Sequence, residues 1–186
     1  MTNRLRNHGI DRRPGTRVRD VTIVFTDIED STRRLESMGD IAWLRTLAAH
    51  HRIIRHRARQ HRGMEVSAMG DGFLLVFESL QDAIACTTAI QRDIRDHVRR
   101  HPSQEIHVRV GIHTGETIAA EDAGLVGRNV HLASRVADQA AGGEILLTDA
   151  ALERSDPPPS TNLGESRRAA LRGLPGTHAL HPLSWT

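Results

Sequence analysis

Apolar residues along this 186-residue chain recur with two different periods, and each change of period marks a predicted secondary-structure element. Residues 18–26 are strand-like, and the residues that follow can cap a helix: Asp30, Ser31 and Thr32. A longer helix is predicted after Gly39 and is expected to end at Gly63. Its apolar residues keep helical spacing and are expected to face the core: Ile41, Leu44, Leu47, Ala48 and Ile54.

The middle of the chain is predicted to contain a β-hairpin followed by a second long helix. Residues 64–69 and 73–77 are strand-like, and a Gly-Asp-Gly sequence at 70–72 separates them, which is a hairpin signal. The helix is expected over residues 80–99, with these apolar residues facing inward: Ala83, Ile90, Ile94 and Val98.

The remaining part of the chain is predicted to be rich in strands. A strand over 106–112 is expected to end in a turn at Thr114 and Gly115, before another short strand that runs through Ala119. The further predicted elements are a helix over 129–140 and strands over 144–148, 168–171 and 178–183. Elements in this order indicate an α+β fold, with a mostly antiparallel sheet and helices packed on one face.

Length and composition are typical of one ordinary domain, because 186 residues with 38% apolar content can form a hydrophobic core. Residues 1–16 are polar and rich in arginine, so we expect a disordered lead-in followed by a domain over 17–186. There is no run of about 18 apolar residues and no export signal. We therefore expect a cytoplasmic protein that has no membrane partner. Cys86 lies in a helical apolar run and is expected to be a core residue.

The charged residues suggest nucleic-acid binding at first, because the sequence pI is about 9.8 and all 25 basic residues are arginines. However, 23 acidic residues are interspersed among them, and only 3% of the chain is aromatic. A chain with so few aromatic side chains offers few surfaces on which bases can stack. We therefore expect no nucleic-acid partner.

Two aspartates stand out because each lies beside an apolar strand-like run. Asp27 follows the first predicted strand, and Asp71 lies in the turn of the predicted hairpin. If these strands are neighbours, both carboxylates point to one place, where they could bind hard cations. Two cations about 3.5–4 Å apart are suited to phosphoryl chemistry. Each aspartate alone could instead be a helix cap or a turn residue.

Six short motifs follow one another along the chain: FTDIEDST at 25–32, MGDGF at 69–73, VGIHTGE at 110–116, GRNVHLASR at 127–135, GEILLT at 143–148 and LRGLP at 171–175. With these motifs in this order and spacing, the chain resembles the class III nucleotidyl cyclase catalytic domain of adenylyl and guanylyl cyclases. The resemblance covers nearly the whole chain and implies the ferredoxin-like cyclase fold.

The resemblance also implies a set of site residues. Asp27 and Asp71 would bind two Mg or Mn ions, with the main-chain carbonyl of Ile28 completing one site. The triphosphate would be bound by the backbone at the start of the next helix and by one arginine near the C-terminus: Ile28, Glu29, Asp30, Ser31, Thr32 and Arg172. Arg135 matches the family's transition-state arginine.

Three positions depart from the adenylyl cyclase pattern. Ser67 stands in place of a base-reading lysine, and Gly124, with Asp122 two residues earlier, stands in place of its acidic partner. The chain therefore lacks the charged pair that would bind adenine directly. His131 replaces the asparagine that orients the ribose, although histidine can still donate a hydrogen bond.

The resemblance implies a homodimeric enzyme that converts a nucleoside triphosphate into a cyclic nucleotide and pyrophosphate. ATP, which gives cyclic AMP, is favoured as the substrate, and the sequence leaves GTP open as the alternative. Its sites would be shared, so that Asp27 and Asp71 of one chain face His131 and Arg135 of the partner subunit. The alternative is a catalytically weak or inactive module with a cyclase fold. Such a module would keep the metal pair, lack base recognition and act by dimerising with another chain.

Overall fold

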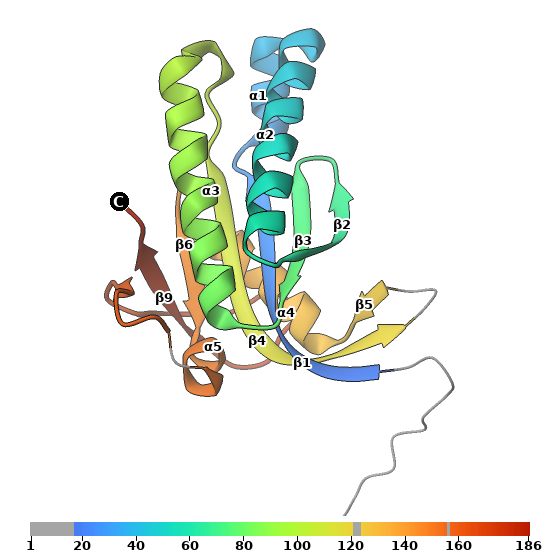
Figure 1. Ribbon diagram of the computed structural model, residues 1–186, viewed down its shortest axis with the longest axis vertical. Helices are drawn as coiled ribbons and strands as arrows, with labels where there is room; N and C mark the ends of the chain where they lie inside the picture. The colour runs from blue at the N-terminus through green and yellow to red at the C-terminus, as the bar shows by residue number, and fades with distance from the viewer. Residues whose placement is uncertain (1–16, 121–123, 156) are drawn as a thin grey trace, which may run out of the picture.

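The computed structural model describes residues 17–120, 124–155 and 157–186 (Figure 1). The predicted lead-in, residues 1–16, lies outside this part. The elements are β1 (Arg17–Ile28), α1 (Ser31–Met38), α2 (Asp40–Gln60), β2 (Met64–Met69), β3 (Gly72–Phe77), α3 (Leu80–Arg100), a 3₁₀ turn (Pro102–Gln104), β4 (Val108–Ala120), β5 (Gly124–Val126), α4 (Arg128–Gln139), β6 (Ile145–Thr148), α5 (Asp149–Arg154), β7 (Asn162–Leu163), β8 (Arg167–Ala169) and β9 (His178–Ser184). Within the described residues, no helix is both long enough and apolar enough to cross a bilayer.

The strands form one nine-stranded sheet in the order β2-β3-β1-β4-β6-β9-β7, with β5 beside β4 and β8 beside β9. All pairings are antiparallel except that of β4 with β6. The sheet thus confirms the predicted α+β fold. The longest pairing joins β1 to β4 and runs from Arg17 opposite Ala119 to Ile28 opposite Val108.

The two faces of the sheet are covered by different helices. Val24 and Ile28 of β1 belong to a large buried cluster that also contains residues of α2 and α3, whereas Val21 and Ile23 pack with Val130 of α4. Figure 1 accordingly shows α2 and α3 in front of the strands and α4 behind them. The expectation of helices on one face only is therefore wrong, because the central strands bury apolar side chains on both faces.

Helix α4 lies unusually close to β4, and Gly111 makes this approach possible. A Cβ atom at Gly111 would lie 2.3 Å from the backbone N of Ala137 and 2.8 Å from the carbonyl O of Ala133. These are backbone atoms of α4, so a methyl group here could be accommodated only by moving the helix. The glycine of the VGIHTGE motif thus fixes the distance between α4 and the sheet.

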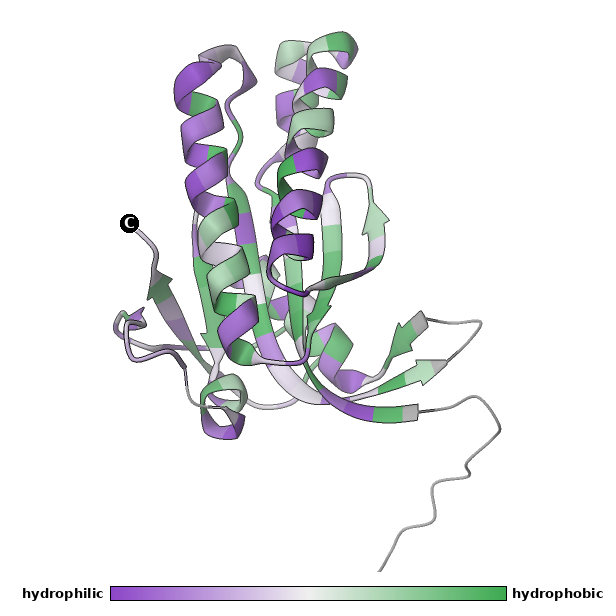
Figure 2. Ribbon diagram, in the orientation of Figure 1, coloured by the Kyte–Doolittle hydropathy of each residue, from purple (hydrophilic) through white to green (hydrophobic). Residues whose placement is uncertain are grey.

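The apolar stripe predicted for the first long helix is partly wrong. Ile41 and Leu44 of α2 are 72% and 67% exposed. The residues that α2 buries are Thr46, Ala49, His50, Ile54 and Ala58. This face includes Thr46 and His50, which are polar and therefore do not belong to the apolar pattern of the sequence. Figure 2 shows the resulting arrangement, in which green predominates in the central strands and purple along much of α2 and α3.

The predicted turn at Thr114 and Gly115 is also wrong. These two residues pair with Thr22 and Val21 of β1, so β4 continues without interruption to Ala120. Long-range pairing with β1 therefore overrides the local turn signal of the glycine. The lone cysteine is as expected, since Cys86 lies in the core and burial raises the pKa of its thiol to about 12.

Substitution of Gly111 tests the close packing of α4. We expect Gly111→Ala to lower the free energy of unfolding by about 1–3 kcal/mol, because the added methyl group meets the backbone of α4. Gly164→Ala is the matched control, since its Cβ would lie 3.5 Å from Cβ of Pro182, an ordinary contact. Urea denaturation followed by circular dichroism measures both variants. Equal stability of the two would contradict the close-packing argument.

Candidate active site

The structure brings Asp27 and Asp71 together from two neighbouring strands. Asp27 follows Thr26 of β1, which pairs with Phe73 of β3, so the end of β1 lies beside the hairpin turn. The backbone N–H of Ile28 donates a hydrogen bond to Oδ2 of Asp71 at 3.3 Å. A Cβ atom added at Gly72 would lie 3.7 Å from Oδ1 of Asp27. The hairpin therefore places one carboxylate beside the other.

The hairpin turn owes its shape to its glycines. Met69 pairs with Gly72, which leaves Gly70 and Asp71 as a two-residue loop. Gly70 has φ of 62°, in the left-handed region, and glycine adopts this conformation without steric cost. A glycine with positive φ at the first central position is the pattern of a type II′ turn, which suits the twist of hairpin strands.

Arg109 completes this group of charges. It is the residue of β4 directly opposite Asp27 of β1. Its Nε and Nη2 donate hydrogen bonds to Oδ2 of Asp27 at 3.1 and 2.5 Å. The sequence pattern does not single out Arg109, because one of many arginines in a strand looks like an ordinary solvent-facing residue. The only available signal is its place inside the apolar run that precedes Gly111.

The carboxylates carry more negative charge than Arg109 balances. Burial raises the pKa of Asp27 above its ordinary value, and the nearby charge of Asp71 raises it further, although Arg109 opposes both effects. A bound cation would relieve this repulsion. The donors are oxygen atoms, which suit Mg or Mn. Among the described residues no group of three His, Cys, Asp or Glu side chains gathers around one point, so main-chain and substrate oxygens would have to complete the coordination.

An open hollow of about 440 Å³ is lined by Ile28 and Arg109, the residues that hydrogen-bond to Asp71 and Asp27. Its lining also contains three more of the residues expected to bind phosphate, Asp30, Ser31 and Thr32, together with Arg33 and Glu36. Asp30 precedes α1 with φ of 53°, and no side-chain cap is formed. The first N–H groups of a helix have no partner within the helix. Those of Ser31 and Thr32 therefore remain available to an anion at the start of α1.

Glu29 has other contacts in this structure. Its backbone N–H donates to the carbonyl of His107 at 2.9 Å, and its carboxylate accepts from the N–H of Gly142 at 2.8 Å. The N–H of Ile28 is likewise already bonded to Asp71. Counting hydrogen bonds among the described residues, the part of the expected phosphate cradle whose N–H groups have no partner is thus shorter than the sequence suggests and lies at residues 30–32.

The residue expected to orient the ribose, His131, and the residue expected to stabilise charge on the α-phosphate, Arg135, both lie on α4. His131 is exposed there, and Arg135 is paired with Asp138 at 2.6 Å, one turn along the same helix. Arg172 is exposed too. Leu171, just before it, is buried with Leu132 and Val136 of α4. Arg172 therefore lies near the helix that carries Arg135, and the structure gives neither arginine a contact with Asp27 or Asp71.

The two positions expected to read the base lie on different strands, β2 and β5. Ser67 is exposed on β2, where the pairing with β3 shifts register between Glu65 and Ser67. Gly124 is the first residue of β5 and pairs with Ala120. Asp122 lies outside the described residues.

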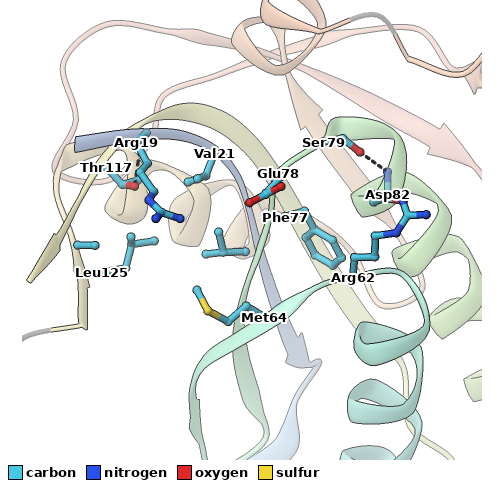
Figure 3. A pocket seen from close by; sticks show the side chains of 12 residues that line it. Arg19, Val21, Arg62, Met64, Phe77, Glu78, Ser79, Asp82, Thr117 and Leu125 are labelled. Atoms are coloured by element: carbon cyan, nitrogen blue, oxygen red, sulfur yellow. Dashed lines mark hydrogen bonds and ion pairs between the residues drawn. The ribbon is translucent and has the colours of Figure 1, made fainter. Parts of the chain in front are cut away.

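A larger hollow of about 510 Å³ lies where the arm of β4 and β5 approaches the first residue of β2 (Figure 3). Its lining is largely apolar, with Val21, Met64, Phe77 and Leu125 among the residues. At its edge Arg62 and Asp82 form an ion pair of 3.5 Å. None of its described lining residues is a site residue expected from the sequence, so its size alone does not make it the active site.

Comparison with known proteins identifies the family. The sequence model of the adenylate and guanylate cyclase catalytic domain matches residues 14–182, which is most of the chain. The chain belongs to this family. The match contains all six motifs singled out in the sequence.

Curated relatives of this cyclase domain have varied architectures. An uncharacterized protein of Mycobacterium tuberculosis is 30% identical over 176 residues, which are 91% of this chain and 57% of that protein. The receptor-type adenylate cyclase B of Leishmania donovani is 27% identical over 185 residues, 78% of this chain and 14% of the relative. The serine/threonine-protein kinase pkn2 of Myxococcus xanthus is 29% identical over 132 residues, 70% of this chain and 16% of the kinase. The cyclase domain thus spans between 14% and 57% of these relatives.

Solved structures confirm the cyclase fold. The guanylyl cyclase Cya2 superimposes with a TM-score of 0.80 at 24% identity, covering 91% of this chain and 93% of the other. The adenylyl cyclase CyaB from P. aeruginosa has a TM-score of 0.76 at 19% identity, covering 91% and 95%. The predicted mostly antiparallel cyclase fold is therefore correct.

The repulsion between the two carboxylates predicts a stabilising substitution. Folding raises the pKa of Asp27, so its ionised form costs stability at neutral pH, and this stability returns as the pH falls through the raised pKa toward 3.8. Asp71→Asn removes the neighbouring charge. We expect it to raise the free energy of unfolding of the metal-free cyclase domain at pH 7.5 by about 0.5–1 kcal/mol, because the site is partly exposed.

Asp93→Asn is the matched control for this measurement. Asp93 accepts two hydrogen bonds from Arg57, at 2.6 and 2.7 Å, so the same chemical change should lower stability there. Urea denaturation in EDTA compares the two variants with the unaltered protein. A loss of stability in Asp71→Asn would show that repulsion does not dominate this pair.

Proposed function

We propose that this domain is an active nucleotidyl cyclase that converts a nucleoside triphosphate, preferably ATP, into the 3′,5′-cyclic nucleotide and pyrophosphate. The observation that supports this most is the convergence of Asp27 and Asp71 beside the hollow at the start of α1. Two carboxylates that only supported the fold would not be expected to lie where they repel each other, whereas a cation site requires such a pair. The family membership supplies the class of reaction.

The chemistry would be almost entirely electrostatic. Two Mg or Mn ions held by Asp27 and Asp71, with the carbonyl of Ile28, would lower the pKa of the attacking 3′-hydroxyl and neutralise phosphate charge. The N–H groups at residues 30–32 would bind phosphate oxygens at the positive end of α1. Arg109 lines the same hollow, and because only its Nε and Nη2 contact Asp27, Nη1 remains to donate to a phosphate oxygen.

The site is proposed to be shared by two subunits. Asp27 and Asp71 lie at the junction of β1 with the hairpin, while His131 and Arg135 lie on α4 and Arg172 follows a residue packed against α4. Within one chain, Arg135 is bound to Asp138 rather than to the carboxylates. In a homodimer, His131 and Arg135 of the partner subunit would orient the ribose and stabilise charge on the α-phosphate.

Base selection is proposed to be weak. Ser67 and Gly124 offer no charged pair, and sites discriminate strongly only when a wrong substrate leaves their buried polar groups unpaired. The second candidate function, a weak or inactive regulatory module, rests on these two positions and on His131. Retention of both carboxylates and of Arg135 favours the enzyme.

An assay of purified protein with each nucleotide tests the function. With Mn we expect cyclic AMP from ATP and a smaller amount of cyclic GMP from GTP, with a preference well below about 10⁴-fold. Asp27→Ala and Asp71→Ala should each abolish product formation, because the chemistry depends on the charge they hold. Both variants should keep the circular dichroism spectrum of the folded protein. Near-normal turnover in either variant would refute the two-metal assignment.

Mixing two inactive variants tests the shared site. Asp27→Ala and Arg135→Ala chains should each be inactive alone and recover activity together, since the heterodimer regains one intact site out of two. Subunit exchange is verified separately with fluorescently labelled chains. If the chains exchange and no activity returns, each subunit must carry a complete site or none.

A further inference from the structure

Helix α2 contacts the hairpin that carries Asp71, and His51 of this helix contacts Gly70, the residue before Asp71. Nε2 of His51 lies 2.9 Å from the carbonyl oxygen of Gly70. A carbonyl oxygen can only accept, so the ring nitrogen carries the hydrogen and donates it. Figure 1 shows α2 running alongside β2 and β3. A helix outside the proposed site is thus tied to the residue next to a proposed metal ligand.

The same part of α2 also packs against Phe73, the first residue after the turn. Phe73 of β3 is only 1% exposed, and the His51 ring meets it edge to face with ring centroids 5.0 Å apart. The His50 ring lies 5.8 Å away, and burial, with the neighbouring His51, lowers the pKa of His50 to about 3. His50 is therefore neutral and packs as an apolar ring. The guanidinium of Arg55 lies 5.4 Å from the Phe73 ring centroid.

The strand on the far side of the hairpin is held by α2 as well. Arg55 donates two hydrogen bonds of 2.8 Å to the carboxylate of Glu65 on β2. This matters because β2 is the edge of the sheet and has only β3 as its neighbour. The two strands of the hairpin are therefore held against α2 by the contacts of Arg55 with Glu65 and by the packing of Phe73. The hydrogen bond from His51 holds the turn between them.

The turn has little other support. Met69 is 81% exposed, and a Cβ atom at Gly70 would meet nothing within 4 Å. On its inner side, the turn is held by the N–H of Ile28, which donates to Asp71 at 3.3 Å. On its outer side, His51 holds the carbonyl of Gly70. A two-residue loop held at both sides has little freedom to move its aspartate.

We propose that His51 is a positioning residue, which fixes the Gly70–Gly72 turn and so sets where the Asp71 carboxylate meets a divalent cation. The inference rests on the proposed function of Asp71 as a metal ligand. It gives α2 a role in the site, although none of the site residues expected from the sequence lies on α2. Loss of the hydrogen bond would let the turn move, and metal affinity would fall without loss of the fold.

Manganese binding without nucleotide tests this role. Titration of the full chain with Mn²⁺, with free Mn²⁺ followed by electron paramagnetic resonance, reports affinity independently of catalysis. We expect His51→Leu to bind Mn²⁺ about tenfold more weakly. In the cyclase assay it should raise the Mn²⁺ concentration for half-maximal rate more than it lowers the maximal rate. His56→Leu is the matched control, because His56 is exposed on the same helix, and it should bind as the unaltered protein does.

A second pair of variants separates positioning from folding. In His51→Gln the side-chain amide nitrogen lies about as far from the backbone as Nε2 of histidine, so this variant should keep normal Mn²⁺ affinity. In His51→Asn the side chain is too short to reach the carbonyl of Gly70, so this variant should bind Mn²⁺ weakly. Equal affinity in these two variants, or normal affinity in a folded His51→Leu, would overturn the positioning role alone. If the unaltered protein binds no Mn²⁺, the metal assignment of Asp71 fails, and this inference fails with it.

Discussion

The antiparallel pairing of β1 with β3 on one side and β4 on the other is the constraint on which the site depends. It places Asp27 beside the Asp71 turn and directly opposite Arg109, which comes 82 residues later in the chain. Side chains alternate along a strand, so a slip of one residue in this register would turn Asp27 toward the other face of the sheet. The same slip would move Val24 and Ile28 out of one core and Val21 and Ile23 out of the other.

The negative charges that would bind a cation also lower the stability of the folded protein. Burial and the charge of Asp71 disfavour ionised Asp27, while Arg109 compensates only in part. A fold selected for stability alone would have little reason to keep this arrangement, and a cation site gives it one. Arg109 contributes in two ways, since it pairs with the charge of Asp27 and also lines the hollow beside α1. Its guanidinium thus connects the proposed metal position with the proposed phosphate position.

The surrounding helices divide the remaining tasks. α1 begins without a side-chain cap, α2 supports the hairpin through His51 and Arg55, and α4 carries His131 and Arg135. Gly111 brings α4 close to the sheet and so fixes where those two residues lie. The ion pair of Arg135 with Asp138 within one helix agrees with the proposal that its catalytic partners belong to another subunit.

The sequence by itself determined the main elements, the hairpin with Asp71 at its turn and the candidate carboxylate pair, because periodicity and glycine turns are local signals. Only the tertiary structure decided which face α2 buries, that α4 covers the second face, and that β4 continues through Thr114 and Gly115. It alone revealed Arg109 beside Asp27 and His51 beside Gly70. These contacts join residues 19 and 82 positions apart, and they depend on strand register and helix packing, which local patterns do not encode.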